Sequence, residues 1–264
     1  MAEYDLSERT ALVTGAGRGN GKASAELLAA SGASVVVNDL EEEVAEATAA
    51  GIREDGGEAI AVGADVSDEA EVEAMVGHAA DEFGTVDVVV NNAGVGKVEA
   101  FAEKPGDELF DLNLDTHLMG AVYCTKHALD GMREQGYGKV INLTSIHTKN
   151  GVGLSPQYDI GKYSLLGLTK SLALELGPYG IRVNAVAPGW VNTRMTETFT
   201  ERTREQITGL NPLGRFAESG DIGEAVTFLA APASDYVNGH EFRVDGGQQP
   251  IDRFKYESDM SEKH

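Results

Sequence analysis

Short apolar runs alternate along the chain with longer stretches in which apolar residues recur at helical spacing. The short runs are rich in Val, Ile and Ala and end at Gly, Asn or Asp, which predicts buried strands with helices between them. The strands are expected at residues 10–14, 34–38, 59–63, 86–90, 139–144, 181–187 and 241–244. This alternation predicts an α/β fold built on a doubly wound, seven-stranded parallel sheet flanked by helices.

No internal repeat or linker interrupts the alternation, so we expect residues 1–264 to form a single domain with a substantial core. No apolar run reaches the length that spans a membrane. The start of the chain, MAEYDLSERT, lacks the basic and apolar segments of a signal peptide. We therefore expect a cytoplasmic protein without a membrane partner.

The chain carries 43 acidic residues against 21 Lys and Arg, a formal net charge of −22. The acids are spread along predicted helices, for example over residues 39–46 and 65–73, and form no acidic tail. Nucleic acid is not an expected partner, because phosphate binding needs a basic surface. The excess of acid resembles proteins of salt-loving organisms, in which salt screens self-repulsion. An ordinary acidic bacterial protein is the alternative.

The cysteine and histidine content limits the disulfide and metal sites that the chain can form. The one cysteine, Cys124, excludes a disulfide framework and lies in an apolar helical stretch, where a buried, inert thiol is expected. No Cys/His cluster has the spacing of metal ligands. We expect no metal site.

The first part of the chain has the order of a dinucleotide-binding βαβ unit. An apolar run, Thr10–Thr14, leads into a glycine turn over Gly15–Gly21, a helical stretch and a second strand that ends before Asp39. The glycines allow a pyrophosphate to approach the backbone, and the helix start offers free N–H groups. Asp39 follows Gly15 by 24 residues, where it is expected to accept hydrogen bonds from the adenosine ribose. A glycine turn alone is also compatible with an ordinary tight turn.

A second constellation lies in TSIHTKNGVGLSPQYDIGK. Tyr158 and Lys162 are four residues apart and share one helix face, and Ser145 follows an apolar run. A nearby cation lowers the pKa of a tyrosine, and such a phenol can exchange a proton with an alcohol or carbonyl oxygen. On the pattern alone, a lysine lying beside a half-buried tyrosine is the simpler alternative.

Taken in order, these motifs resemble the short-chain dehydrogenase/reductase family across essentially the full chain. The motifs that carry the resemblance are Thr14-Gly15-x-x-x-Gly19-x-Gly21, Asp65-Val66, Asn91-Asn92-Ala93-Gly94, the Ser145, Tyr158 and Lys162 trio, Pro188-Gly189 with Thr193, and Val244-Asp245-Gly246-Gly247. The resemblance implies a Rossmann fold with strand order 3-2-1-4-5-6-7 and a homotetramer. It also implies that residues 1–150 mainly bind cofactor, whereas residues 139–264 supply catalysis and substrate binding.

The resemblance assigns roles residue by residue. Tyr158 is implied as the acid/base, Lys162 as the group that lowers its pKa and holds the nicotinamide ribose, and Ser145 as the hydrogen-bond donor to the substrate oxygen. The implied cofactor residues are Gly15, Arg18, Gly19, Asn20, Gly21, Asp39, Leu40, Asp65, Val66, Asn92, Ala93, Gly94, Tyr158, Lys162, Pro188, Gly189, Val191 and Thr193. Asp39 should repel the extra phosphate of NADP and Arg18 should favour it, and we expect Asp39 to dominate and select NAD.

Two positions depart from the family pattern. Asn20 stands where the family usually has Ile or Leu, and it either contacts the cofactor or is a tolerated substitution at a helix start. His117, with Leu118-Met119-Gly120, fits the family's Asn-Leu-x-Gly pattern 28 residues before Ser145, whereas Asn113 lies one turn too early. We expect His117 to take the catalytic asparagine's place in a proton relay, titrating near neutrality. A histidine that only packs is the alternative.

The substrate is expected to bind in the second half of the chain. It is expected to contact the segment from Trp190 to Leu213, together with Ser145, His147 and Gln157. The Ser-Ile-His run and the C-terminal tail resemble sugar dehydrogenases, which favours a sugar, a polyol or a sugar-derived hydroxy acid. His117 resembles the hydroxyacyl-CoA group, so a 3-hydroxyacyl-CoA dehydrogenase or 3-oxoacyl reductase is the alternative. A dinucleotide-binding sensor without turnover is a third hypothesis.

Overall fold

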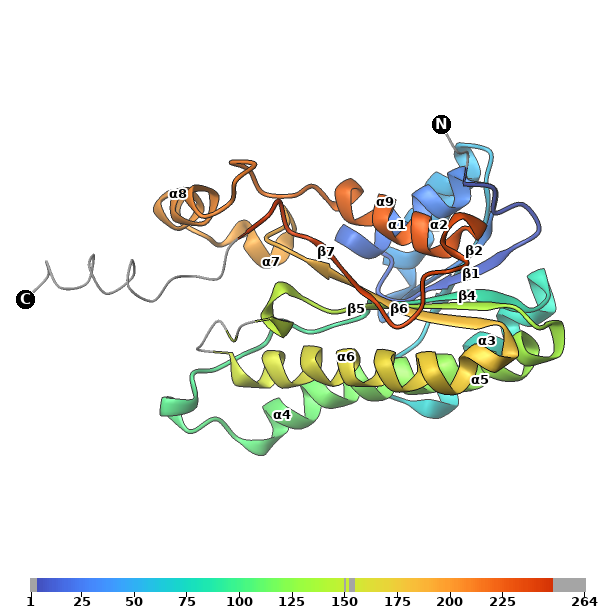
Figure 1. The fold of residues 1–264 in the computed structure, drawn as a ribbon, viewed down its shortest axis with the longest axis horizontal. Helices are drawn as coiled ribbons and strands as arrows, with labels where there is room; N and C mark the ends of the chain where they lie inside the picture. Colours follow the sequence, from blue (N-terminus) through green and yellow to red (C-terminus); the bar gives the residue numbers. More distant parts are fainter. Residues whose placement is uncertain (1–3, 150, 152–154, 249–264) are drawn as a thin grey trace, which may run out of the picture.

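A computed structural model describes residues 4–149, 151 and 155–248 of the chain. Its centre is one seven-stranded sheet in the order β3-β2-β1-β4-β5-β6-β7, and every neighbouring pair is parallel (Figure 1). The strands are β1 (Thr10–Val13), β2 (Ser34–Asp39), β3 (Glu58–Gly63), β4 (Val86–Asn91), β5 (Gly138–Leu143), β6 (Ile181–Pro188) and β7 (Glu241–Val244). The predicted fold class and strand order are therefore confirmed, with strand ends that differ by at most one residue.

Helices cover both faces of the sheet. In Figure 1, α1, α2 and α9 lie on one face, whereas α3, α4, α5 and α6 lie on the other. The α-helices are α1 (Gly19–Ala30), α2 (Glu42–Glu54), α3 (Glu69–Phe83), α4 (Asp107–Leu114), α5 (Gly120–Gln135), α6 (Pro156–Leu176), α7 (Arg194–Glu197), α8 (Glu201–Gly209) and α9 (Ser219–Ala230). Short helical turns are η1 (Phe101–Glu103), η2 (Asp115–Met119, a π-helix), η3 (Ile146–Thr148), η4 (Gly177–Tyr179) and η5 (Pro232–Ser234).

The sheet divides two apolar cores. Alternate residues of each strand point to opposite faces, so that Val35 and Val37 join the core under α1 and α9, whereas Val36 joins the core under α3, α5 and α6. Because both faces are covered, the central strands are apolar at almost every position, which is why short apolar runs identified them. The tail residues 249–264 lie outside the described residues.

The carboxyl ends of all seven strands meet at one edge of the sheet because the strands are parallel. The order of the strands reverses between β1 and β4, and in open α/β sheets such a switch point creates a crevice for ligands. The turn at Gly15 and the end of β4 at Asn91 therefore lie side by side, although 76 to 79 residues separate their bonded partners.

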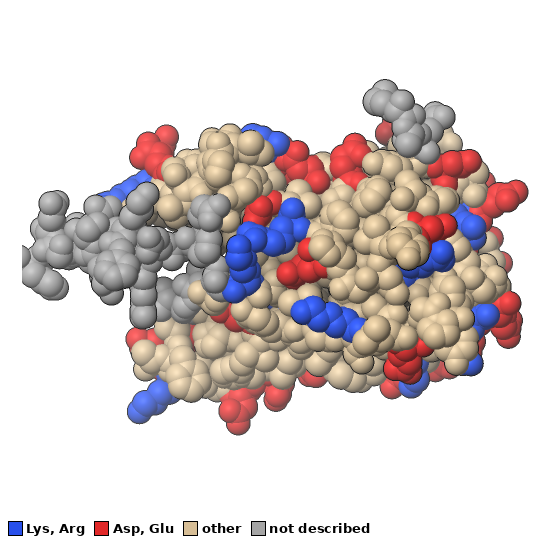
Figure 2. Space-filling view, viewed as in Figure 1, with Lys and Arg blue, Asp and Glu red and all other residues tan. Residues whose placement is uncertain are grey.

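Acidic side chains are scattered over the surface and outnumber the basic ones on the face that Figure 2 shows. They form no single acidic segment, in agreement with their spread along the helices. In residues 4–149, 151 and 155–248, the helices are all too short or too polar to cross a membrane.

Candidate active site

The turn between β1 and α1 is built for close backbone approach. Gly15 and Gly19 have φ angles of +59° and +52°, a region that favours glycine. A Cβ at Gly21 would lie 2.2 Å from the Gly15 carbonyl oxygen and 2.4 Å from Asn92 Nδ2, so no side chain fits there. The start of α1, where N–H groups are free of helical partners, is consequently pressed against the turn. This cradle fits a dinucleotide pyrophosphate.

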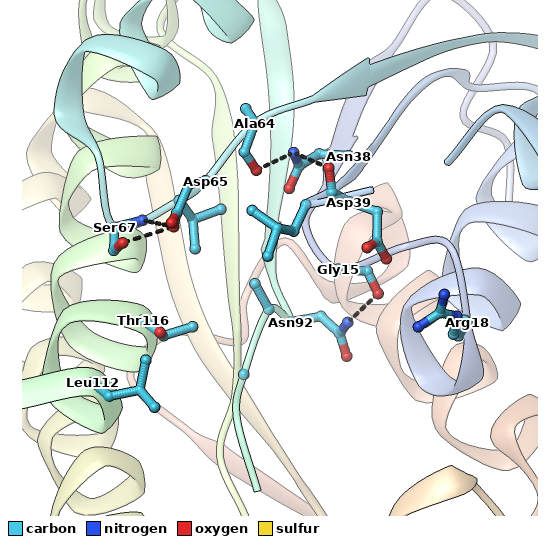
Figure 3. Close-up of a pocket in the computed structure, with 14 residues that line it drawn as sticks. Gly15, Arg18, Asn38, Asp39, Ala64, Asp65, Ser67, Asn92, Leu112 and Thr116 are labelled. Carbon is cyan, nitrogen blue, oxygen red and sulfur yellow. Dashed lines mark hydrogen bonds between the residues drawn. The ribbon is translucent and has the colours of Figure 1, made fainter. Parts of the chain in front are cut away.

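Two side chains lock this turn to the end of β4. Asn92 Nδ2 donates to the carbonyl oxygens of Thr14 (2.9 Å) and Gly15 (3.0 Å), as Figure 3 shows for Gly15. In return, Thr14 Oγ1 accepts from the backbone N–H groups of Asn92 (3.1 Å) and Ala93 (3.0 Å). We refer to these four bonds as the Thr14–Asn92 lock. The lock fixes both walls of the crevice relative to each other.

A cavity of about 340 Å³ lies beside the lock and opens between β1, β2, β3 and β4 (Figure 3). It is lined by Gly15, Arg18, Asn38, Asp39, Leu40, Ala64, Asp65, Val66, Ser67, Asn92, Ala93, Gly94, Leu112 and Thr116. Nine of these were predicted from the sequence. The predicted residues outside this lining are Gly19, Asn20, Gly21, Tyr158, Lys162, Pro188, Gly189, Val191 and Thr193.

Five lining residues were missed by sequence reasoning. Leu112 and Thr116 reach the cavity from α4 and η2, a neighbourhood that no local pattern indicates. Asn38 is 1% exposed, and its Nδ2 donates to the carbonyl oxygens of Val62 (3.2 Å) and Ala64 (3.1 Å). It thereby ties the ends of β2 and β3. An asparagine at the end of an apolar strand, just before Asp39, was the available signal.

The acidic end of the cavity is arranged around Asp39. Its Oδ2 accepts from the backbone N–H of Gly17 (3.1 Å), and its Oδ1 accepts from that of Glu41 (3.3 Å). The guanidinium of Arg18, which lines the same cavity, pairs with Glu41 Oε1 at 2.9 Å. A group that enters beside Asp39 therefore meets its carboxylate and a cation that is already paired with another acid.

Ser145, Tyr158 and Lys162 come together at the ends of β5 and α6. Ser145 caps η3 and accepts a hydrogen bond from the backbone N–H of His147 (3.2 Å). Lys162 lies one turn beyond Tyr158 on α6, with its Nζ 5.6 Å from the centroid of the phenol ring. Lys162 Nζ donates to the carbonyl oxygen of Leu143 (2.8 Å). The three side chains that the sequence singled out thus form one cluster.

The charges in this cluster differ from the sequence-based expectation. Burial lowers the pKa of Lys162 to about 7. Burial raises the pKa of Tyr158, a side-chain hydrogen bond with Ser145 lowers it, and the carboxylate of Asp159 raises it. The Nζ of Lys162 is directed to the Leu143 carbonyl, and the net shift of the Tyr158 pKa is upward. The expected net lowering of the Tyr158 pKa is therefore not found, because burial of the phenol outweighs the bond with Ser145.

His117 lies in the π-helical turn η2 and is 2% exposed. Its Nε2 accepts a hydrogen bond from the backbone N–H of Val95 (3.2 Å), and its ring meets the Tyr158 ring edge-to-face at 5.5 Å. Glycines make room for it, since a Cβ at Gly94 or Gly161 would lie 2.7 or 2.5 Å from an imidazole nitrogen. Backbone atoms of these two glycines therefore lie close to the imidazole ring on two sides.

Burial, together with the nearby ammonium of Lys162, lowers the pKa of His117 to about 2. The expectation that it titrates near neutrality was wrong, because the ring is desolvated and its Nε2 serves as an acceptor. Asn113 is fully buried one turn earlier, and its Nδ2 donates to the carbonyl oxygens of Leu109 (2.8 Å) and Lys97 (3.1 Å). Asn113 thus braces the loop after β4.

The side chains predicted to contact substrate have separate environments. Gln157 is fully buried and its Nε2 donates to the carbonyl oxygen of Glu99 (3.1 Å), which makes it a tie between α6 and the loop after β4. His147 Nδ1 lies 2.6 Å from Asp159 Oδ1. The ring of His147 contacts those of Tyr158 (5.2 Å between centroids) and Trp190 (6.2 Å) edge-to-face.

The rings of His147 and Trp190 form a wall beside Tyr158. This wall continues to Phe199, whose ring centroid lies 5.3 Å from that of Trp190. Asp159 was not predicted from the sequence. Asp159 pairs with His147 twelve positions earlier in the chain, and local spacing does not reveal this contact.

In the described part of the chain, no group of three or more His, Cys, Asp or Glu side chains is arranged to hold a metal ion.

Comparison with known proteins identifies the family. The family model described as enoyl-(acyl carrier protein) reductase matches residues 15–249, which include the glycine turn, the cavity and the Ser145, Tyr158 and Lys162 cluster. The chain belongs to the short-chain dehydrogenase/reductase family. This short-chain dehydrogenase/reductase is therefore an oxidoreductase that acts on hydroxyl or keto groups of a small-molecule substrate, and the family binds NAD(P).

Individual relatives match it along nearly their whole length. It is 39% identical to cis-4-hydroxycyclohexanecarboxylate dehydrogenase of Sinomonas cyclohexanicum, over 93% of this chain and 98% of that protein. It is 40% identical to 3-oxoacyl-[acyl-carrier-protein] reductase of a Synechocystis strain, over 92% and 97%. The solved structure of a candidate gluconate dehydrogenase from Agrobacterium tumefaciens matches with a TM-score of 0.90 at 32% identity, over 94% and 98%.

Proposed function

We propose that this protein is an NAD-dependent dehydrogenase that interconverts a secondary alcohol and a ketone, or a lactol and a lactone. We propose a sugar, a polyol or a sugar-derived hydroxy acid as its substrate. The observation that carries the proposal is the cluster of Ser145, Tyr158 and Lys162 beside the glycine turn. A sensor without turnover would have no need for all three side chains, which makes that hypothesis the weakest.

In the proposed mechanism each side chain acts on a stated atom. The bound dinucleotide supplies the hydride donor or acceptor. Tyr158 exchanges its phenolic proton with the substrate oxygen, and Ser145 holds that oxygen by a hydrogen bond. Lys162, with its pKa of about 7, is available to pass a proton at neutral pH. His117 stays neutral and holds the N–H of Val95, so its proposed role is to position the loop after β4.

The substrate class is supported by the wall beside Tyr158. His147, oriented by Asp159, and Trp190 present one polar and one aromatic surface, which suits a ring that carries hydroxyl or carboxylate groups. Two of the relatives above act, by their names, on a cyclic hydroxy acid and on gluconate.

The alternative is a 3-hydroxyacyl or 3-oxoacyl thioester, which the 3-oxoacyl reductase relative supports. The net charge of −22 opposes an acidic carrier protein as partner.

NAD is proposed over NADP because of the carboxylates at the end of β2. Asp39 lines the cavity, and Glu41 pairs with Arg18, a cation that lines the same cavity. A 2′-phosphate placed beside Asp39 would meet like charge in a partly desolvated cavity.

Replacing Asp39 with Asn tests this choice. We expect the ratio of kcat/KM with NAD to kcat/KM with NADP to fall by about tenfold or more, which corresponds to ~1.4 kcal/mol. Asp39→Asn keeps a side-chain oxygen as acceptor for Gly17 N–H, so the turn should stay intact. The control is Asp68→Asn, at the start of α3 and outside the cavity lining, which should leave the ratio unchanged. An unaltered ratio in Asp39→Asn would refute the role of this carboxylate.

The proposed function itself is tested by following NAD and NADP reduction in high salt with a panel of substrates. The panel holds D-gluconate, L-rhamnose, sorbitol, cis-4-hydroxycyclohexanecarboxylate and a 3-hydroxyacyl-CoA. Turnover of a cyclic or sugar-type compound with NAD supports the proposal. Turnover of the thioester alone would replace it with the hydroxyacyl alternative.

Further features remain proposals about the protein in its cell. We propose a cytoplasmic homotetramer from a salt-loving organism, with no nucleic-acid partner. The 43 acids against 21 Lys and Arg support the salt-loving origin, which is why high salt is used in the assays. Exposed apolar side chains on α6, namely Ile160 (45%), Tyr163 (42%) and Leu174 (83%), support subunit contact along this helix.

A further inference from the structure

A carboxylate on the last strand reaches the turn that carries Ser145. Glu241 begins β7, on the far side of β6 from β5. Its Oε1 accepts hydrogen bonds from Thr144 Oγ1 (2.8 Å) and from Thr148 Oγ1 (2.7 Å). These two hydroxyls lie on either side of Ser145 in the sequence, one before η3 and one at its end. A single oxygen atom thus joins both flanks of the turn.

The sheet leaves a path for this side chain. Ala185 of β6 is the neighbour of Glu241 on one side and of Asn142 of β5 on the other, so all three residues are in register. Side chains of registered neighbours point to the same face of the sheet. Two residues further along β6, Ala187 pairs with Arg243 of β7 and points to the same face of the sheet as Ala185. Because both of these β6 residues carry only a methyl group, the Glu241 carboxylate can reach across β6 to the two threonines.

Both hydroxyls also contact backbone carbonyls of the same region. Thr148 Oγ1 lies 2.6 Å from the carbonyl oxygen of Ser145, and Thr144 Oγ1 lies 3.1 Å from that of Val186. Each hydroxyl has one proton and two possible acceptors. The carboxylate oxygen is the acceptor that both share, and bonds to a charged acceptor are the stronger ones. Glu241 therefore fixes where Thr148 Oγ1 sits against the Ser145 backbone.

We propose that Glu241 is a positioning residue for Ser145, acting through Thr144 and Thr148. This inference rests on the proposed function, in which Ser145 holds the substrate oxygen. Ser145 is 7% exposed, and its Oγ is already directed by the N–H of His147. A hydroxyl that must meet a developing charge loses much of its effect when it is displaced slightly. The far edge strand thus helps to set the geometry of the serine.

The test compares Glu241→Ala with Glu241→Gln, because glutamine keeps an oxygen where both threonines donate. The assay is NAD reduction with cis-4-hydroxycyclohexanecarboxylate, or with the fastest compound of the panel above. We expect Glu241→Ala to lower kcat by about tenfold with little change in KM, and Glu241→Gln to keep activity within about threefold. The matched control is Glu224→Ala on an exposed position of α9, which should have no effect.

Two further readouts separate positioning from a general structural role. In a Ser145→Ala background, Glu241→Ala should cost less than about twofold, since residues that act as a unit are not additive. Hydrogen exchange of the Thr148 amide, which donates to the Ser145 carbonyl (3.0 Å), should accelerate in Glu241→Ala. An equal loss of kcat with and without Ser145, or unchanged exchange at Thr148, would overturn the inference. Unaltered turnover in Tyr158→Phe would instead overturn the proposed function.

Discussion

Tyr158→Phe is expected to abolish turnover while leaving dinucleotide binding intact. We expect kcat to fall by about 10³-fold or more, because the phenol is the proposed proton donor and acceptor and no other hydroxyl of the cluster replaces it. Phenylalanine keeps the ring, and with it the edge-to-face contacts to His117 (5.5 Å) and His147 (5.2 Å). The packing around Lys162 should therefore survive, and the dissociation constant for NAD should stay within about twofold.

The measurement combines steady-state kinetics with a titration of NAD by fluorescence or calorimetry. Tyr163→Phe is the matched control, since Tyr163 lies on the same helix but is 42% exposed, and it should retain full activity. If Tyr158→Phe kept its turnover, the acid/base assignment would be wrong. If it lost NAD binding as well, the loss of turnover would have to be attributed to the site's architecture.

Lys162→Met is expected to inactivate the protein and, at the same time, to stabilise it in the absence of NAD. Lys162 is 5% exposed, and burial lowers its pKa from 10.5 to about 7. The unfolded chain keeps the higher pKa, so between pH 7 and 10.5 it binds a proton that the native protein releases. Stability therefore rises with pH across this window, and the buried lysine costs most at pH 7 and below.

The drop in pKa from 10.5 to about 7 sets an upper limit of about 5 kcal/mol on this cost. Methionine has no charge to bury, but its introduction leaves the Leu143 carbonyl without the lysine donor, which costs about 1–3 kcal/mol. The net gain in unfolding free energy should be about 1–3 kcal/mol at pH 6 and should shrink towards pH 10.

Thermal unfolding at pH 6, 7.5 and 9.5 checks this directly. The comparison variant is Lys170→Met, which changes an exposed lysine two turns further along α6 and should shift the midpoint equally at every pH. A midpoint difference for Lys162→Met that grows with pH would contradict the assigned burial cost. Turnover should fall by about 10²-fold or more at all three pH values.

The sheet was predictable because its strands are buried on both faces. Runs such as Val86–Val90 are apolar at nearly every position, so their number, order and ends could be read from composition and length. Motifs that depend on backbone conformation were equally visible. Gly15 and Gly21 have no alternative residue at their positions, because a positive φ or a contact below 3 Å excludes every side chain.

Electrostatics could not be read in the same way. The spacing of Tyr158 and Lys162 correctly placed both groups in one cluster, but the direction of the pKa shifts depends mainly on burial. The sequence predicted the position of His117. Its tautomer follows only from the structure, in which Nε2 accepts a hydrogen bond from the N–H of Val95. Pairs such as His147 with Asp159 join segments whose approach is decided by the whole fold.

The Thr14–Asn92 lock also bears on the order in which the protein gains its ligand. Its four bonds join groups 77 to 79 positions apart, so they form only after β1 has paired with β4 and the chain between has been enclosed. Contacts of such separation are made late in folding, because the loop must close first. A nascent or partly folded chain with only β1, α1 and β2 assembled would lack one wall of the crevice. Dinucleotide would then act as a ligand of the completed sheet, holding newly made molecules in the folded state without guiding them there.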